Sequence, residues 1–156
     1  MKPTHDDWTD LGFRLLFSTI FLGLGGEHLF QDELVQKLMP DWFIYKRVLS
    51  ILAGLVLVCG GLAVVTAFHL RYAAMMLAGF LVTVTTLIHL PELSGTPSGL
   101  TEDWVWLWQV FQRSNFVKNL CLLGVCIHLM TYQPGCFTLQ KILRYYRDKA
   151  DSKPSI

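Results

Sequence analysis

Polar residues capable of acid–base chemistry stand at the ends of long apolar segments in this sequence. Glu27 and His28 close the first segment, His89 closes another, and Lys118 with Asn119 opens a further one. Histidine changes its charge near neutral pH and a carboxylate can accept a proton, so these residue types suit proton transfer or polar ligand binding. Because polar groups in hydrocarbon are costly, they mark a candidate functional site.

Four apolar segments would have to position these residues. The sequence predicts helices at about residues 11–30, 48–69, 72–90 and 116–133. Such segments have about the 18–20 residues needed to cross a bilayer core. Of the 156 residues, 53% are hydrophobic and only 16% are charged, whereas a soluble domain carries about 25% charged residues. We therefore expect an all-α protein that forms a four-helix transmembrane bundle.

Lysine and arginine are distributed unequally over the predicted loops. Four crossings put both termini on one side, with Lys2, Arg14, Arg71, Lys141, Arg144, Arg147, Lys149 and Lys153. The other side holds Lys37, Lys46, Arg47, Arg113 and Lys118. Since basic residues favour the cytoplasmic side, we expect cytoplasmic termini: an N-terminal segment 1–10, a membrane domain 11–133 and a basic tail 134–156.

Alternating crossings would bring the polar residues to one depth near the outer membrane face. The candidate site then consists of Glu27, His28, Arg47, His89, Glu92, Lys118 and Asn119. In one interpretation, Glu27 pairs with Arg47 or Lys118 and serves only to fix the helix register.

Two further interpretations of the same residues involve a ligand. His28 and His89 could bind a haem or a metal ion, with a carboxylate as a further ligand or hydrogen-bond acceptor. The site could instead hold a small lipophilic or redox molecule such as a quinone, with a histidine or carboxylate transferring protons. The residues leave these alternatives open.

Two other segments are expected at the membrane surface. Trp104, Trp106 and Trp108 fall within an expected outer loop at 91–115, and tryptophan favours the membrane–water interface. This segment is predicted to be an interfacial helix or a lid over the polar site. The basic tail predicts attraction to anionic lipid. A net charge of +1 argues against a nucleic-acid partner.

The order of short motifs along the chain provides a family resemblance. The first helix opens with Arg14-Leu15-Leu16 and closes with Gly25-Gly26-Glu27-His28-Leu29-Phe30, and Pro40 follows. Gly54 and Gly60-Gly61-Leu62 lie in the second helix, Arg71-Tyr72-Ala73-Ala74 begins the third, and Phe116-Val117-Lys118-Asn119-Leu120 opens the fourth. Over about residues 11–133, this pattern resembles the DoxX family of small four-helix membrane proteins.

The resemblance implies a role in a membrane redox or stress-response system of the bacterial cytoplasmic membrane. A related DoxD-type protein is a subunit of a thiosulfate:quinone oxidoreductase, and mycobacterial relatives are linked to a membrane oxidoreductase complex. We therefore expect an accessory or small subunit with an oxidoreductase partner and a possible quinone ligand. The alternatives are a membrane enzyme or transporter for a small lipophilic substrate, and a haem- or metal-binding bundle. The family offers no catalytic motif, so enzymatic activity stays open.

Overall fold

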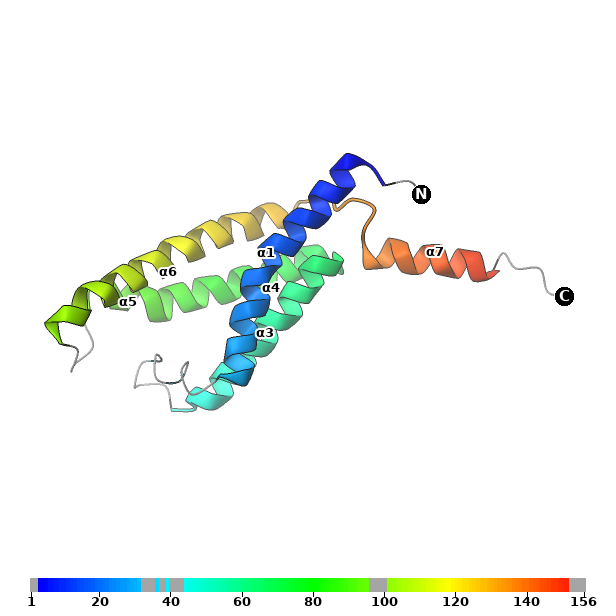
Figure 1. The fold of residues 1–156 in the computed structure, drawn as a ribbon. Coiled ribbons are helices and arrows are strands. Elements are labelled where there is room, and N and C mark those ends of the chain that lie inside the picture. The colour runs from blue at the N-terminus through cyan, green and yellow to red at the C-terminus, as the bar shows by residue number, and fades with distance from the viewer. Residues whose placement is uncertain (1–2, 32–35, 37–38, 40–43, 96–100, 152–156) are drawn as a thin grey trace.

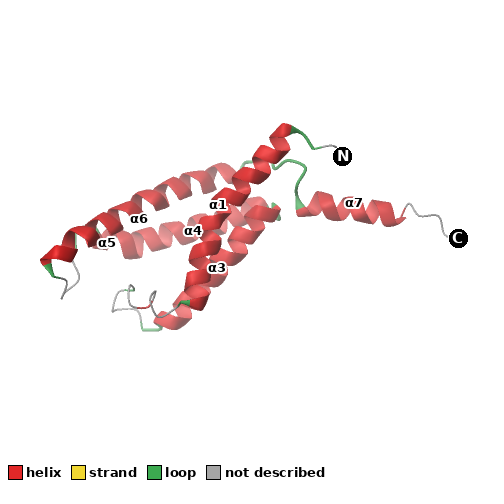
Figure 2. Ribbon diagram, viewed as in Figure 1, coloured by secondary structure: helices red, strands yellow, loops and turns green. Residues whose placement is uncertain are grey.

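The computed structural model describes residues 3–31, 36, 39, 44–95 and 101–151. The elements are α1 (His5–Phe30), α3 (Lys46–Thr66), α4 (Leu70–Val84), the π-helical segment η1 (Thr85–His89), α5 (Leu90–Glu92), α6 (Glu102–Leu129) and α7 (Leu139–Asp151). Every regular element in these residues is helical, which confirms the predicted all-α class (Figure 2).

The four long helices pack in an open row. Helix α1 packs on α3, α3 on α4, and α4 with η1 and α5 on α6. Figure 1 shows the α1/α3 pair and the α4/α6 pair diverging from the turn that joins α3 to α4. Two left-handed residues, Ala67 and His69, make this turn tight. The polar ends of the two pairs therefore lie at the divergent end of the molecule.

Two helices begin earlier than the sequence predicted. Helix α1 starts at His5 because Thr4 and Asp7 form a capping box, in which each side chain accepts a hydrogen bond from the other's backbone N–H. Helix α6 starts at Glu102, so the tryptophan segment is its first part and not a separate loop. No glycine or proline occurs between Glu102 and Leu123 to interrupt that helix.

Small residues lie at close helix contacts beside the large apolar side chains of the core, and further large apolar side chains cover the surface. A Cβ added to Gly54 would lie 3.0 Å from the Gly25 carbonyl oxygen, so α1 and α3 touch backbone to backbone. Ala73, Ala74 and Ala78 are buried in α4. Leu16 is 76% exposed and Leu62 51% exposed. Small residues at helix contacts and apolar residues outside are the pattern of a protein in lipid.

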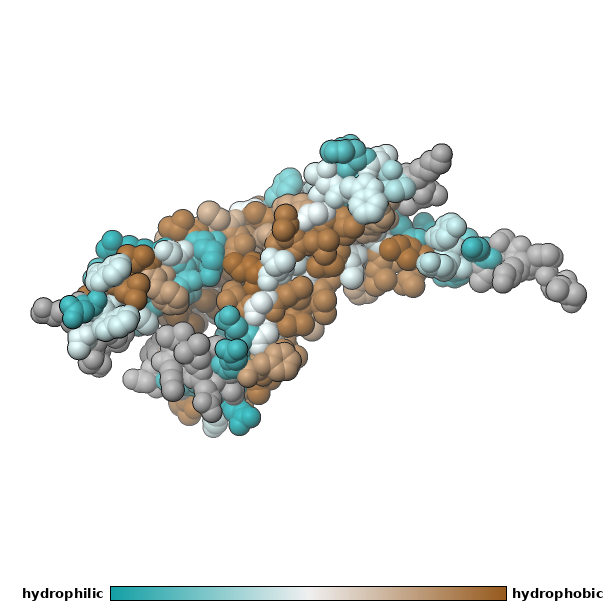
Figure 3. Space-filling model, in the orientation of Figure 1, coloured by the Kyte–Doolittle hydropathy of each residue, from teal (hydrophilic) through white to brown (hydrophobic). Residues whose placement is uncertain are grey.

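Within the residues that the structure describes, two helical stretches are long and apolar enough to cross a membrane, namely Lys46–Thr66 and Leu70–Glu92. Only 33% of the most apolar 18-residue segment of the first stretch is buried inside the protein, and only 28% of that of the second. The core helix of a soluble protein would bury most of such a segment. Figure 3 shows the exposed apolar residues as a belt over the middle of the molecule, with hydrophilic residues towards its ends. The chain is therefore a membrane protein.

Candidate polar site at the divergent ends of the helix pairs

His28 joins α1 to α3 at one side of the site. The buried face of α1 includes Arg14, Phe21 and Gly25, and half-buried His28 continues this face near the end of the helix. The close approach at Gly25 brings the ring to Ser50 of α3. The Nδ1 atom of His28 lies 3.1 Å from the Ser50 hydroxyl oxygen, and that hydroxyl donates to the His28 carbonyl oxygen at 3.2 Å.

These two contacts fix the tautomer of His28. A serine hydroxyl has one hydrogen, and Ser50 gives it to the backbone carbonyl. The contact at Nδ1 is then a hydrogen bond that the ring donates. In the neutral ring, Nε2 carries the lone pair, and no described residue forms a hydrogen bond with it. His28 can therefore accept a proton or a hydrogen bond at Nε2.

His89 has the same arrangement in the other helix pair. Its Nδ1 atom lies 2.8 Å from the carbonyl oxygen of the buried Gln112 side chain in α6. An amide oxygen only accepts, so Nδ1 donates and Nε2 again carries the lone pair. One more bond joins these helices, from Asn119 Nδ2 to the Thr85 hydroxyl at 3.1 Å.

A local departure from α-helix positions Thr85 and His89. Both belong to the π-helical segment η1, which runs directly into Leu90-Pro91-Glu92. Pro91 has no N–H to donate and its ring crowds the carbonyl four residues earlier, which accounts for the wider turn before it. Single π-helical turns are frequent at functional sites. Here the turn places both side chains against α6.

Lys118 lies between the two helix pairs. Its ammonium donates to Asn115 at 2.6 Å, and its charge interacts with the Glu27 carboxylate of α1 and with His89. Glu27 itself is exposed, since it lies about 100° round the helix from His28. None of the direct ion pairs found among the described residues joins Glu27 to Lys118. Lys118 therefore provides positive charge in a region that α1, α4 and α6 share.

A buried donor in α6 has no hydrogen-bond partner in the described part of the chain. The indole Nε1 of Trp108 is buried without a hydrogen bond among the described residues. Trp108 precedes Gln112 by four residues, so both lie on the same face of α6. An unsatisfied buried N–H costs about 1–3 kcal/mol. Such a donor would be satisfied by a ligand with an acceptor oxygen.

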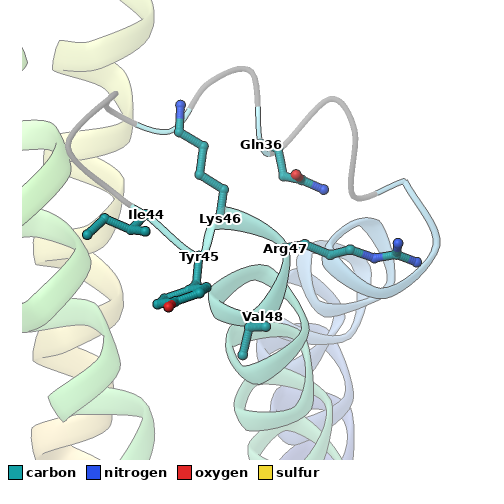
Figure 4. A pocket seen from close by; sticks show the side chains of 6 residues that line it. All are labelled: Gln36, Ile44, Tyr45, Lys46, Arg47 and Val48. Atoms are coloured by element: carbon teal, nitrogen blue, oxygen red, sulfur yellow. The ribbon is translucent and has the colours of Figure 1, made fainter.

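The remaining predicted residues occupy the margin of the site. Arg47 borders an open hollow of about 460 Å³ at the start of α3, lined also by Gln36, Ile44, Tyr45, Lys46 and Val48. Figure 4 shows Ile44 and Tyr45 on one side of this hollow and Arg47 on the other. Glu92 is partly buried one turn after His89.

The predicted residues thus form two groups, one on each helix pair. His28 belongs to the first, His89 and Asn119 belong to the second, and Lys118 interacts electrostatically with both sides. Ser50, Thr85 and Gln112 were not predicted from the sequence, and Trp108 was predicted only as part of an interfacial helix or a lid over the polar site. Ser50 lies four residues before Gly54 on the close-contact face of α3, which was the available signal. In the parts of the chain that the structure describes, no three His, Cys, Asp or Glu residues come together to hold a metal ion.

A second polar cluster lies at the opposite end of the molecule. The fully buried Arg14 guanidinium pairs with Asp10 at 3.0 Å and donates to the carbonyl oxygens of Val65 and Phe137, the latter at 2.8 Å. Asp10 also accepts from the Gly135 N–H at 3.1 Å. These bonds fix the segment after α6 to the beginning of α1, and we call them the arginine clasp.

Three titratable groups next to the clasp have shifted pKa values. Hydrogen bonds from the backbone N–H groups of Thr4 and Cys136 hold the pKa of Asp7 well below its usual value. Burial, and then the nearby Asp7 carboxylate, raises the pKa of the Cys136 thiol. Burial and the charge of Asp10 raise the pKa of Tyr132. Near neutral pH, an ionised Asp7 carboxylate, a protonated Cys136 thiol and a protonated Tyr132 phenol therefore lie next to the clasp.

The sequence matches a model of a protein family. A sequence model of the DoxX family matches residues 9–90, which is more than half of the chain. The match covers most of α1, then α3 and α4, and includes His28 and His89, whereas α6 and α7 lie beyond it. No curated protein and no solved structure matches the sequence.

Proposed function

The chain belongs to the DoxX family, and we propose that it is a small, multi-pass subunit of a redox system in the bacterial cytoplasmic membrane. Its polar site would bind a quinone or quinol between the α1/α3 and α4/α6 pairs. We further propose that all four long helices cross the bilayer, with both termini in the cytoplasm and the site near the outer face. An oxidoreductase partner would exchange electrons with the bound molecule.

The unpartnered Trp108 indole is the observation that carries this proposal. The indole offers a buried N–H donor one helical turn from Gln112. The Gln112 side chain accepts a hydrogen bond from Nδ1 of His89, which leaves Nε2 of His89 available as an acceptor. A quinone carbonyl accepts hydrogen bonds and a quinol hydroxyl donates one. The Trp108 N–H could therefore donate to a quinone carbonyl, and His89 could accept from a quinol hydroxyl. The site would then suit both the oxidised and the reduced form of the ligand.

The histidines could remove protons when a quinol is oxidised. The quinol loses its hydroxyl protons and an electron pair, and it becomes a quinone. Nε2 of His28 or His89 would take up a hydroxyl proton, because each ring already donates through Nδ1. The positive charge of Lys118 would favour the anionic form that precedes electron loss. The electrons would pass to the partner subunit.

Substitution of Trp108 tests the proposal, with the same substitution at Trp106 as the control. We would measure binding of a short-chain quinone to the protein in nanodiscs. Trp108→Phe keeps an aromatic ring but removes the N–H, so binding should weaken by about tenfold, which corresponds to about 1.4 kcal/mol. Trp106→Phe makes the same chemical change at an exposed position of α6 and should bind as the unsubstituted protein does.

Two results would contradict the proposal. Equal quinone affinity in Trp108→Phe and Trp106→Phe would show that the indole donor makes no contact with the ligand. Turnover of a lipophilic substrate by the isolated chain, without an electron-transfer partner, would favour a membrane enzyme over an accessory subunit.

A further inference from the structure

We infer that α7 is an interfacial helix that binds the anionic lipid surface of the membrane on the side where α1 begins. No other described helix packs on α7, and Figure 1 shows it extending away from the other helices. The inference concerns a different end of the molecule from the polar site. It rests on membrane embedding but not on quinone binding.

The apolar residues of α7 form a single stripe. Leu139, Ile142, Leu143 and Tyr146 follow the spacing i, i+3, i+4 and i+7, which places them on one face of a helix. Leu139 is partly buried where α7 begins, but Leu143 is 59% exposed and Tyr146 is 63% exposed, so no described residue covers most of this face. An amphipathic helix of this kind buries its apolar face at the boundary between lipid headgroups and acyl chains.

The charged residues identify an anionic surface as the partner. Helix α7 carries the four basic residues Lys141, Arg144, Arg147 and Lys149 against two acids, Asp148 and Asp151. At 100° per residue, Arg147 and Lys149 flank the apolar stripe, whereas Arg144 and Asp148 lie on the opposite face. Cations beside a buried stripe lie at headgroup depth, where each contributes about 1 kcal/mol of attraction to an anionic leaflet.

The arginine clasp places the beginning of α7 at the end of the membrane helices. Arg14 holds the Phe137 carbonyl, and the Trp8 and Phe137 rings lie 4.7 Å apart. Thr138 then starts α7, because its hydroxyl accepts a hydrogen bond from the Lys141 N–H at 3.2 Å. The helix therefore leaves the bundle beside the start of α1, close to the membrane surface.

The test uses the full chain with its native cysteines replaced and one fluorescent label on α7. The label is attached through Leu143→Cys on the apolar stripe or through Asp148→Cys on the opposite face. The protein is reconstituted in nanodiscs of neutral phosphatidylcholine, or of phosphatidylcholine with phosphatidylglycerol. In the anionic discs, a water-soluble quencher should act several-fold less on the Leu143→Cys label than on the Asp148→Cys label.

Charge variants separate attraction to anionic lipid from apolar burial alone. Replacing Arg147 and Lys149 together with glutamine should remove most of the protection, whereas Arg147→Lys combined with Lys149→Arg should preserve it. Equal quenching of the two labels in anionic discs would overturn the inference. The inference would also be overturned if the Leu143→Cys label were protected as well in neutral discs as in anionic discs, or if its protection required two copies of the chain in one disc. Each readout is independent of quinone binding.

Discussion

The guanidinium of Arg14 is fully buried and pairs with the Asp10 carboxylate at 3.0 Å, one turn earlier in α1. The same guanidinium holds the carbonyl groups of Val65 and Phe137. One side chain therefore joins the start of α1, the end of α3 and the segment after α6. A charge without a partner at this depth would be strongly unfavourable, so the pair sets the geometry of this end of the protein.

Arg14→Gln should destabilise the protein by about 3–5 kcal/mol, because it leaves the buried Asp10 carboxylate without its partner. Unfolding by sodium dodecyl sulfate in mixed micelles would measure the loss. The exposed Arg113→Gln removes the same charge and should change stability by less than about 0.5 kcal/mol. Equal stabilities of the two variants would show that the clasp does not stabilise the fold.

The contact between α1 and α3 predicts a difference between two glycines. In Gly54→Ala, the new Cβ would lie 2.8 Å from Leu29 Cγ and 3.0 Å from the Gly25 carbonyl oxygen, so the helices must move apart. We expect a loss of about 1–3 kcal/mol in the same unfolding assay. Gly23→Ala has nothing within 4 Å and should be neutral or slightly stabilising. A neutral Gly54→Ala would contradict this packing.

Cys136 should react slowly with alkylating reagents near pH 8. The thiolate is the reactive form, and burial together with the Asp7 carboxylate raises the pKa of this thiol above its ordinary value of 9.0. Alkylation should therefore begin at higher pH than for a free cysteine. Asp7→Asn keeps an acceptor for the Cys136 N–H but removes the charge, so its alkylation profile should shift to lower pH. Peptide-resolved mass spectrometry over a pH series would follow this cysteine alone.

An unchanged alkylation profile in Asp7→Asn would show that the carboxylate does not control the thiol. The matched control is Asp6→Asn, which removes a neighbouring acidic charge that makes no contact with Cys136.

The helical class could be predicted because it depends on local pattern. Long apolar runs with few charges predicted helices at about 48–69 and 72–90, where the structure has α3 at Lys46–Thr66 and the continuous helical stretch Leu70–Glu92 formed by α4, η1 and α5. Helix boundaries were harder to predict where a few side chains determine them. The Thr4–Asp7 capping box makes α1 begin before the predicted start. The tryptophan segment is continuous with the fourth long helix, so α6 also begins before its predicted start.

The candidate site could be predicted only in outline, because its contacts depend on helix rotation. The sequence placed polar residues at similar depths, but it could not show that His28 turns towards α3 while Glu27 turns outwards. It also gave no sign that Thr85 and His89 share a π-helical turn. Gly23 and Gly25 look equivalent in sequence, yet only Gly25 meets another helix. Tertiary packing decides each of these points.

Photo-crosslinking with a quinone analogue tests the central claim most directly. Membranes containing the full chain would be irradiated with a photoreactive quinone, and labelled peptides would be mapped by mass spectrometry. The account predicts labels on peptides that contain Trp108 and His89, lost on addition of unlabelled quinone and reduced in Trp108→Phe. Labelling confined to lipid-facing residues such as Leu16 and Leu62, without competition by unlabelled quinone, would contradict it.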